Sequence, residues 1–371
     1  MADSVMRKSP DLVLYNGATK VKWKYDFAML GIAISKLYNG SQNTEYYYEY
    51  AKDFMDDLVL SGGTMIKYDM DAYNLDFVQP AKLLILLYRD TGEAQYLSSI
   101  ETIVRQLEDQ PRTESGGYFH KLRYPYQMWL DGIYMASPFM AQYAEAFGED
   151  EWYDEAVIQM THIYEKTRDK DTGLLFHAWQ ETREEEWSDP VTGQSPNFWG
   201  RAMGWYLMGV IDSLDFIPED HEGRYELMAM LQDTTAALMT VRDEEYHLWY
   251  QVLDQGDREG NYLEASASAM YTYVFAKAAK KGYIEWEYFD YSMESFDAML
   301  DQFITTTVDD DIDGGGDEII ALHNVASGIG LGFGDGVYRD GSFEYYAGVE
   351  TVGNDAKGVG PFILAAIELG R

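Results

Sequence analysis

The chain has 371 residues, of which 46% are hydrophobic, and its formal net charge is −36. Such an acidic protein is a poor partner for nucleic acid or for anionic membrane surfaces. It contains no cysteine, which excludes disulfides, thiolate catalysis and cysteine-ligated metals, and no apolar run approaches the length of a membrane span.

Helical periodicity dominates the chain, and glycine, asparagine or proline separates the periodic segments. In chain order the predicted helices cover residues 25–38, 45–60, 75–88, 94–107, 132–147, 152–167, 200–217, 224–241, 263–281, 288–303 and 358–369. Strand signals are scarce, and residues 318–322 form the best short candidate. The glycine-rich stretches 314–316 and 328–336 are expected to be loops that bind no phosphate.

The predicted helices form antiparallel pairs joined by short links. The segments between pairs vary in length, whereas an open solenoid usually repeats with a fixed period. We therefore predict an all-α fold, a closed double ring of helices called an (α/α)6 barrel, as a single domain over residues 1–371. Four long segments carry most of the Trp, Tyr, His and acidic residues, as expected of loops that build a site on a regular scaffold. These segments are 67–74, 111–130, 169–199 and 247–262.

Residues 116–139 concentrate aromatic rings around one acid, Asp131. A carboxylate among rings and aliphatic groups is poorly solvated, which favours its protonated form and suits a general acid. Aspartate is also a favoured helix cap, so Asp131 could instead cap the helix that begins at Gly132. His120 and the basic residues after it could offset the negative field for an anionic substrate, or could be solvated loop charges.

Other residues suit the same chemistry, and each has a plainer alternative. Asp76 lies at the start of the third predicted helix, as a second acid or as an N-cap. His177 could titrate near neutral pH, or could be a structural donor. Arg201 lies between Trp199 and Trp205 and could grip a carboxylate, or could pair with one of the many acids.

The sequence contains no pattern for a metal or a cofactor. Six histidines are present without an HExxH pair or closely spaced carboxylate triplets, and no GxSxG motif marks a serine hydrolase. What remains is acid–base chemistry on a sugar-like ligand held by rings and cations. The N-terminal segment lacks the apolar core of a signal peptide, which predicts a cytoplasmic protein, or a periplasmic one if a leader was removed.

Ten motifs follow one another along nearly the whole chain. They are QPRT at 110–113, FHK at 119–121, YPYQMWLDG at 124–132, DTGL at 171–174, HAW at 177–179, WGRAMGW at 199–205, WYQV at 249–252, RDGS at 339–342, ND at 354–355 and KGVGP at 357–361. In this order they resemble the unsaturated rhamnogalacturonyl hydrolases of glycoside hydrolase family 105. Each motif alone is weak, but the combination is highly specific.

The resemblance implies an (α/α)6 barrel that removes a 4,5-unsaturated uronic acid from the non-reducing end of oligosaccharides made by polysaccharide lyases. It also implies hydration of a vinyl ether rather than displacement at the anomeric carbon. Asp131 would protonate C4, water would add at C5, and the resulting hemiketal would open and release the aglycone. One acid can then suffice where ordinary glycosidases need two flanking carboxylates.

Further roles carry over by matching position. Asp76 would be the supporting acid near the sugar ring, and Arg201, helped by His177, is our choice for the group that grips the uronate. The residues expected to contact substrate are Trp129, Met128, His120, His177, Trp199, Arg201 and Trp205. Gln180 departs from the family pattern, because an acid is expected there in many relatives, and this loosens the prediction on the aglycone side.

Several readings remain open at the level of sequence. The expected partner is an anionic unsaturated oligosaccharide, with rhamnose from rhamnogalacturonan as the aglycone, and nothing indicates the oligomeric state. The strong acidity keeps a marine polysaccharide such as ulvan open, and the related family 88 acts on glycosaminoglycan units. An inverting glycosidase would need a second carboxylate and an epimerase would need paired histidines. A non-enzymatic helical scaffold would have ring-poor loops.

Overall fold

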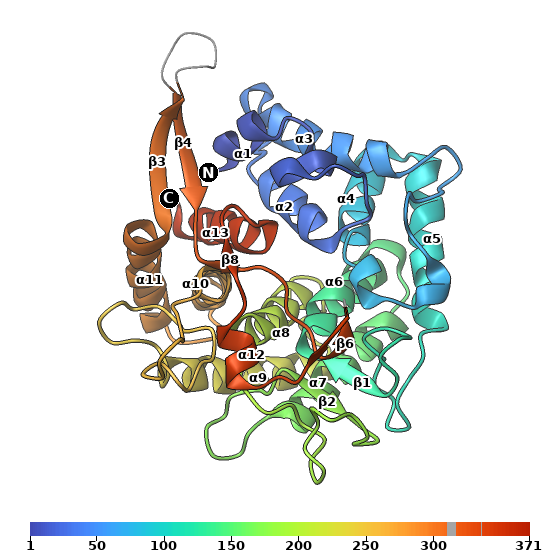
Figure 1. Ribbon diagram of the computed structural model, residues 1–371. Coiled ribbons are helices and arrows are strands. Elements are labelled where there is room, and N and C mark those ends of the chain that lie inside the picture. Colours follow the sequence, from blue (N-terminus) through green and yellow to red (C-terminus); the bar gives the residue numbers. More distant parts are fainter. Residues whose placement is uncertain (310–316, 335) are drawn as a thin grey trace.

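The computed structural model in Figure 1 describes residues 1–309, 317–334 and 336–371 of the chain. Its helices form two concentric rings, and neighbouring members of the inner ring contact one another. The inner helices are α2 (Tyr25–Ser35), α4 (Ala81–Thr91), α6 (Leu130–Phe147), α8 (Gly200–Ser213), α10 (Ala265–Lys280) and α13 (Ala356–Leu369). The last of these contacts both α10 and α2, and so closes the ring.

Each inner helix from α2 to α10 is followed in the chain by an outer helix that packs against it. The outer helices are α3 (Glu45–Leu58), α5 (Ala94–Glu108), α7 (Glu151–Thr167), α9 (Glu222–Met239) and α11 (Glu287–Phe303). Two shorter helices, α1 (Ala2–Lys8) and α12 (Phe343–Ala347), were not predicted. The alternation of inner and outer helices confirms the predicted all-α barrel.

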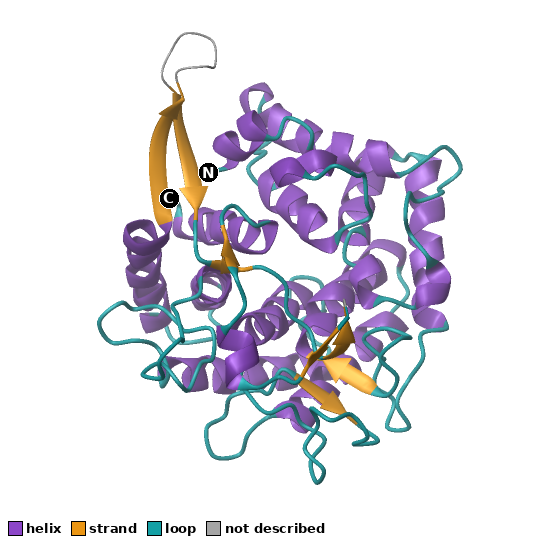
Figure 2. Ribbon diagram, in the orientation of Figure 1, coloured by secondary structure: helices purple, strands orange, loops and turns teal. Residues whose placement is uncertain are grey.

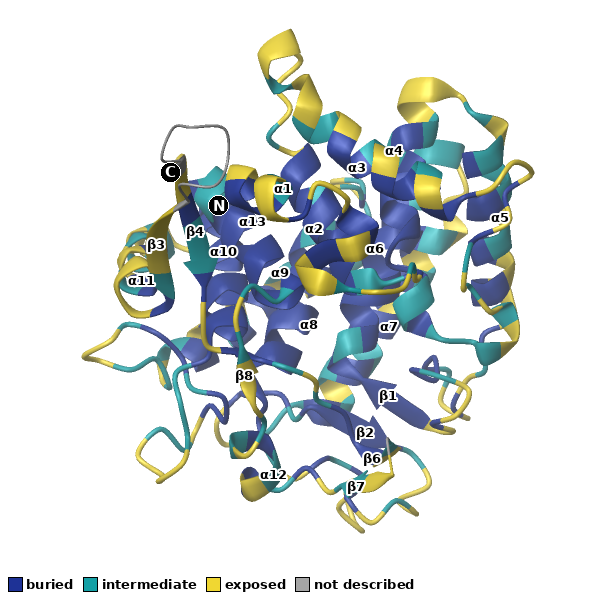
Figure 3. Cartoon of the chain, turned by 45° about the horizontal axis from the view of Figure 1, so that its top comes forward, coloured by how far each residue is buried: buried dark blue, intermediate teal, exposed yellow. Residues whose placement is uncertain are grey.

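Burial separates the two rings, as Figure 3 shows. Every residue of α10 from Ala265 to Ala279 is buried, which is typical of a helix surrounded by other helices. The outer helix α5 buries a stripe that includes Tyr96, Ile100, Ile103 and Leu107, spaced three or four residues apart. The amphipathic outer helices therefore cover an apolar inner ring.

Short antiparallel strand pairs connect the loops at the barrel ends. They are β1 (Gln127–Trp129) with β2 (Ala178–Gln180), β3 (Ile304–Asp309) with β4 (Asp317–Leu322), β5 (Val325–Ala326) with β8 (Thr351–Val352), and β6 (Gly332–Gly334) with β7 (Val337–Arg339). The strand predicted at 318–322 is confirmed as β4, which projects with β3 from the barrel in Figure 1.

Three expectations need comment. The stretch 328–336 was expected to be loop throughout, which is wrong in part because it contains β6. The stretch 314–316 lies outside the described residues. The helix predicted at 75–88 is divided into a short 3-10 helix, Leu75–Phe77, and α4, which begins after Pro80. A proline has no N–H for a helical hydrogen bond, so it favours the start of a new helix.

Candidate active site

Most of the predicted site residues lie where the N-terminal ends of the inner helices meet. Asp131 is in the first turn of α6, Arg201 is in the first turn of α8, and Glu264 caps the N-terminus of α10. The 3-10 helix that contains Asp76 leads into α4. Because helix N-termini carry unpaired N–H groups and a partial positive charge, this end of the barrel favours a negatively charged ligand.

Asp131 contacts His177 and does not cap its own helix. The N-cap residue of α6 is Trp129, and no side chain makes a cap hydrogen bond there. Oδ2 of Asp131 lies 3.3 Å from Nε2 of His177, yet within the described part of the chain neither buried atom has a partner in hydrogen-bond geometry. The carboxyl oxygen therefore lies close to the imidazole without forming a hydrogen bond to it.

The charge state of Asp131 differs from expectation. Burial raises the pKa of Asp131, but His177, His120 and Arg201 together outweigh burial and hold that pKa below its ordinary value. The expectation that aromatic surroundings favour the protonated form is thus wrong for the ligand-free site. The reason is that His177 and Arg201 come from other segments of the chain, so the local sequence around Asp131 does not reveal them.

His177 is fixed from the side opposite Asp131. It is fully buried, and its Nδ1 lies 2.8 Å from the hydroxyl of Tyr346 in α12. The Trp199 ring lies edge-on to the imidazole at 4.6 Å and stacks on Tyr346 at 6.1 Å. The backbone carbonyl of His177 accepts a hydrogen bond from the amide of Leu130, which keeps the imidazole beside the first turn of α6.

Trp129 forms an aromatic wall next to these groups. Its ring is stacked between Tyr124 at 4.8 Å and His120 at 4.7 Å, and it meets His177 edge-on at 5.3 Å. Pairing of β1 with β2 sets Trp129 opposite Ala178, the residue after His177. Burial, followed by the charge of nearby Lys121, lowers the pKa of His120 to about 4, so this imidazole is neutral at physiological pH.

Asp76 is held by basic residues and is not the helix cap. Its Oδ2 lies 2.5 Å from Nζ of Lys121, and its Oδ1 lies 3.6 Å from Nε2 of His120. The cap of this 3-10 helix is Asn74, whose side chain accepts a hydrogen bond from the Asp76 amide. The cap proposed for Asp76 is therefore supplied two residues earlier.

Arg201 is buried with only 1% of its surface exposed. Its Nη1 donates to the carbonyl of Ala326 at 2.6 Å and to Ser266 at 3.2 Å, and it lies 3.7 Å from Oε1 of Glu264. Pairing with an acid, the plainer alternative, is thus observed. Among the described residues, neither Nη2 nor Nε of Arg201 has a hydrogen-bond partner, so both remain for a ligand.

The last two predicted contacts, Trp205 and Met128, lie in different surroundings. Trp205 lies one helical turn after Arg201 in α8. Its ring stacks on Tyr134 at 5.0 Å, beneath the candidate site. Met128 is buried on another side: a Cβ atom at Gly117 would lie 2.1 Å from its sulfur. Met128 therefore packs beneath the loop that precedes β1, where it lines a small pocket with His120, Trp129 and Gly132.

Three residues of the site were not among the predicted contacts. Tyr346 contacts His177 although 169 residues separate them in the chain. The Tyr25 hydroxyl lies near enough to Asp76 and Asp131 for their charges, after burial and Asp26, to raise its pKa. Lys121 pairs with Asp76. Of these three, only Lys121 gave a signal in the sequence, as part of the basic group after His120.

No described group of three histidine, aspartate or glutamate residues is arranged to hold a metal ion.

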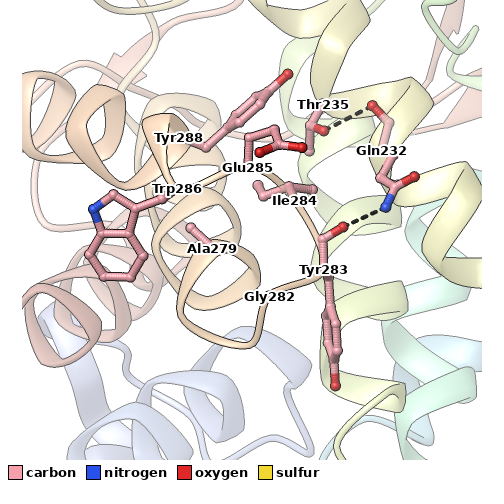
Figure 4. Close-up of a pocket in the computed structure, with 9 residues that line it drawn as sticks. All are labelled: Gln232, Thr235, Ala279, Gly282, Tyr283, Ile284, Glu285, Trp286 and Tyr288. Carbon is pink, nitrogen blue, oxygen red and sulfur yellow. Dashed lines mark hydrogen bonds between the residues drawn. The ribbon is translucent and has the colours of Figure 1, made fainter.

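A cavity of about 560 Å³ lies between α9 and the connection from α10 to α11, and it contains none of the predicted site residues (Figure 4). There the Gln232 amide donates to the carbonyl of Tyr283 at 2.7 Å. No described helix has the length and apolarity to cross a membrane.

Known proteins share this architecture and sequence. A solved structure of a family 105 glycoside hydrolase from C. acetobutylicum ATCC 824 has a TM-score of 0.92 and 36% identity, covering 100% of this chain and 98% of that one. The 24.9 kDa protein in the picA locus of Rhizobium radiobacter is 34% identical over 237 residues, 63% of this chain and 97% of that protein. The unsaturated rhamnogalacturonyl hydrolase YesR of Bacillus subtilis is 26% identical over 285 residues, 75% of each chain.

The match to a family model extends over the same length. Residues 1–371 match the model described as Glycosyl Hydrolase Family 88. The motifs that suggested family 105 therefore lie in a chain that matches both families from end to end. The chain belongs to the glycoside hydrolases of families 88 and 105, and it is a glycosidase.

Proposed function

We propose that this glycosidase removes a 4,5-unsaturated uronic acid from the non-reducing end of lyase-generated oligosaccharides by hydrating the vinyl ether. The observation that carries the proposal is the carboxyl group of Asp131, held against His177 at an end of the barrel that attracts anions. The name of YesR describes action on an unsaturated rhamnogalacturonyl substrate. A leaving sugar of rhamnose therefore has the best support.

Substrate binding would supply the proton-donating form of Asp131. The uronate carboxylate would pair with the free nitrogens of Arg201, which lies in the first turn of α8 with 1% of its surface exposed. That pairing neutralises a cation which holds the pKa of Asp131 down, and the sugar displaces water from the carboxyl group. Both effects raise the pKa of Asp131, so the acid takes up a proton when the site fills.

Asp131 then gives this proton to C4, and the positive charge that develops is shared by C5 and the ring oxygen. Water adds at C5 and returns a proton to the Asp131 carboxylate, which restores the acid. The hemiketal at C5 opens, the bond to the leaving sugar breaks, and one water has been consumed. The Lys121–Asp76 pair, 2.5 Å apart, would orient the sugar hydroxyls.

Unsaturated disaccharides produced by rhamnogalacturonan, ulvan and glycosaminoglycan lyases test this function. The ultraviolet absorbance of the C4–C5 double bond should disappear with at least one uronyl-rhamnose disaccharide. In D₂O the product should carry deuterium at C4, because Asp131 delivers a solvent-derived proton to that carbon. An inverting glycosidase would instead release the unsaturated sugar without deuterium at C4. If every disaccharide kept its absorbance, the proposal would be wrong.

Asp131→Asn tests the assigned acid. The amide cannot donate the proton, so we expect activity to fall by roughly 10²- to 10⁴-fold, the usual contribution of a general acid. Circular dichroism and thermal unfolding should remain close to wild type, because Asp131 makes no cap hydrogen bond in α6. A folded variant with wild-type turnover would show that another group donates the proton.

A further inference from the structure

Arg339 is a cation near the site that the mechanism above does not use. It ends β7, and its side chain lies across Gly334 in the paired strand β6 and Gly330 just before that strand. A Cβ atom at Gly334 would lie 1.3 Å from Nη2 of Arg339, and a Cβ atom at Gly330 would lie 2.8 Å from Nη1. The guanidinium therefore occupies space that exists because these positions have no side chain.

The same glycines place Arg339 beside the aromatic wall. The Cβ position at Gly330 is also 3.4 Å from Cη2 of Trp129, and the Gly330 amide donates to the Tyr345 hydroxyl at 3.1 Å. Burial raises the pKa of Tyr345, while Gly330, Arg339 and Arg201 oppose that rise, so its hydroxyl lies near both guanidinium groups. Arg339 is half-buried, whereas Arg201 is almost fully enclosed.

Arg339 also lacks an acidic partner among the described residues. In a protein with 64 acids, no described carboxylate lies within ion-pair distance of Arg339. Its Nε is buried without a hydrogen-bond partner among the residues that the structure describes. Arg112, Arg168 and Arg242 each pair with a carboxylate. An unpaired buried donor is costly, which makes an oxyanion ligand the natural complement of this guanidinium.

We propose that Arg339 binds an anionic group on the leaving-group side of the oligosaccharide, a sulfate ester or a carboxylate, and so sets the preference of the enzyme for charged aglycones. This rests on the proposed function. Arg201 is deep in the barrel beside the reacting ring, so the more exposed Arg339 meets a group farther along the chain. Its planar fork suits two oxygens of one anion.

Three substrates separate the possible anions. They are an unsaturated uronyl-rhamnose disaccharide, the same disaccharide with a sulfate ester on rhamnose, and an unsaturated tetrasaccharide with a carboxylate on the second leaving sugar. For Arg339→Gln we expect the ratio of kcat/KM, charged over uncharged, to fall by about 10- to 100-fold for the sulfated substrate, the tetrasaccharide or both, mainly through KM.

Two further variants test the glycine cradle and the net charge. Gly334→Ala keeps the charge but displaces the guanidinium, so it should lower the same ratio. Arg258→Gln removes an exposed arginine that pairs with Glu344, and it should leave the ratio unchanged. Far-ultraviolet circular dichroism establishes that each variant is folded.

The outcomes distinguish this inference from the proposed function. A wild-type enzyme that consumes none of the three substrates would overturn both. If wild type consumes them and Arg339→Gln slows all three equally, Arg339 has a different role and the inference alone fails. An unchanged ratio in Arg339→Gln would overturn it as well.

Discussion

At the scale of single residues, the proposed mechanism requires Asp131 to hold a proton only while substrate is bound. In the free site the neighbouring His177, His120 and Arg201 outweigh burial and keep its pKa low. An anionic ligand that pairs with Arg201 reverses this balance. Under the proposed mechanism, the pKa of Asp131 would therefore depend on whether substrate is bound, and the carboxyl group would be ionised in the empty enzyme.

The pH dependence of the kinetics should show this coupling. The active form of the complex carries a proton on Asp131, so kcat should be highest below the pKa of the bound state and fall as pH rises through it. Because the pKa of the free enzyme is lower, kcat/KM should begin to fall at a lower pH than kcat. Steady-state profiles on one disaccharide measure both. If kcat and kcat/KM fell over the same pH range, substrate binding would leave the pKa of Asp131 unchanged.

Tyr346 should support catalysis without touching the substrate. Tyr346→Phe removes the hydroxyl 2.8 Å from Nδ1 of His177, which frees the imidazole to rotate away from Asp131. We expect kcat to fall by about 5- to 30-fold, equivalent to about 1 to 2 kcal/mol, with a smaller change in KM. Tyr50→Phe, which loses a hydrogen bond to Ser9, is the control. Equal effects of the two changes on kcat would indicate a purely structural role.

The sequence predicted which residues gather at the site better than it predicted their partners. Asp131, His177, Trp129 and Arg201 are grouped as expected, because distinctive motifs carry them. Tyr346 could not be predicted: it lies in a five-residue helix, and its contact with His177 exists only in the folded chain. The lowered pKa of Asp131 was missed for the same reason, since long-range neighbours set it.

At the scale of elements, the close approach of α6 and α8 depends on a glycine. A Cβ atom at Gly209 would lie 2.7 Å from Ile133 and 3.0 Å from the backbone nitrogen of Tyr134. The backbone cannot move aside easily, so Gly209→Ala should destabilise the protein by about 1 to 3 kcal/mol in urea unfolding. Asp131 and Arg201 lie on these two helices, so activity should fall as well.

Gly31→Ala in α2 is the matched control. The Cβ atom there would meet only side chains, of which Cδ2 of Leu12 at 3.2 Å is the nearest. Relief of glycine entropy in the helix offsets this contact, so we expect a change within about 1 kcal/mol. A Gly209→Ala protein as stable as Gly31→Ala would show that the two inner helices can separate at little cost.

Helix positions were predictable because long amphipathic segments repeat a clear period, and the structure changes most ends by a few residues. The division at Pro80 and the pairing of β1 with β2 were missed. Strands of three residues are too short to show a two-residue alternation. The partner of β4 was missed because the threonines of β3 have no buried face, as its exposed Thr306 and Thr307 show.

At the scale of the whole molecule, a buried ion-pair network lies between the inner helices. Nζ of Lys277 lies 2.6 Å from Asp212 and from Asp215, and 3.0 Å from the hydroxyl of Tyr273. Burial raises the pKa of Asp212, but Lys277 and Lys36 outweigh it and lower that pKa to about 2. The network therefore links α8 to α10 at the end of α8 away from Arg201.

Lys277→Met should destabilise the fold by about 3 to 5 kcal/mol, because it leaves Asp212 without its main partner. Lys281→Met removes an exposed cation 3.2 Å from Asp215 and should cost less than about 1 kcal/mol. Chemical denaturation at neutral pH compares the two. Similar losses would contradict a role for the buried pair.

The same network makes the stability of the fold depend on pH in the acid range. A carboxyl group whose folded pKa is depressed stabilises the fold above its ordinary value of 3.8, and this stabilisation is lost as pH falls toward 2. The difference in stability between wild type and Lys277→Met should therefore shrink over that interval. A stability difference that stayed constant with pH would show that Lys277 does not lower the pKa of Asp212.

The site is completed by residues near the end of the chain. The carbonyl of Ala326 holds Arg201, the hydroxyl of Tyr346 holds His177, and α13 closes the ring against α2. A ribosome that has made only the first five helical hairpins has produced the acid and the cation but not their supports. Catalytic competence should thus appear only once residues 326–369 have been made, and removal of residues 335–371 should abolish activity.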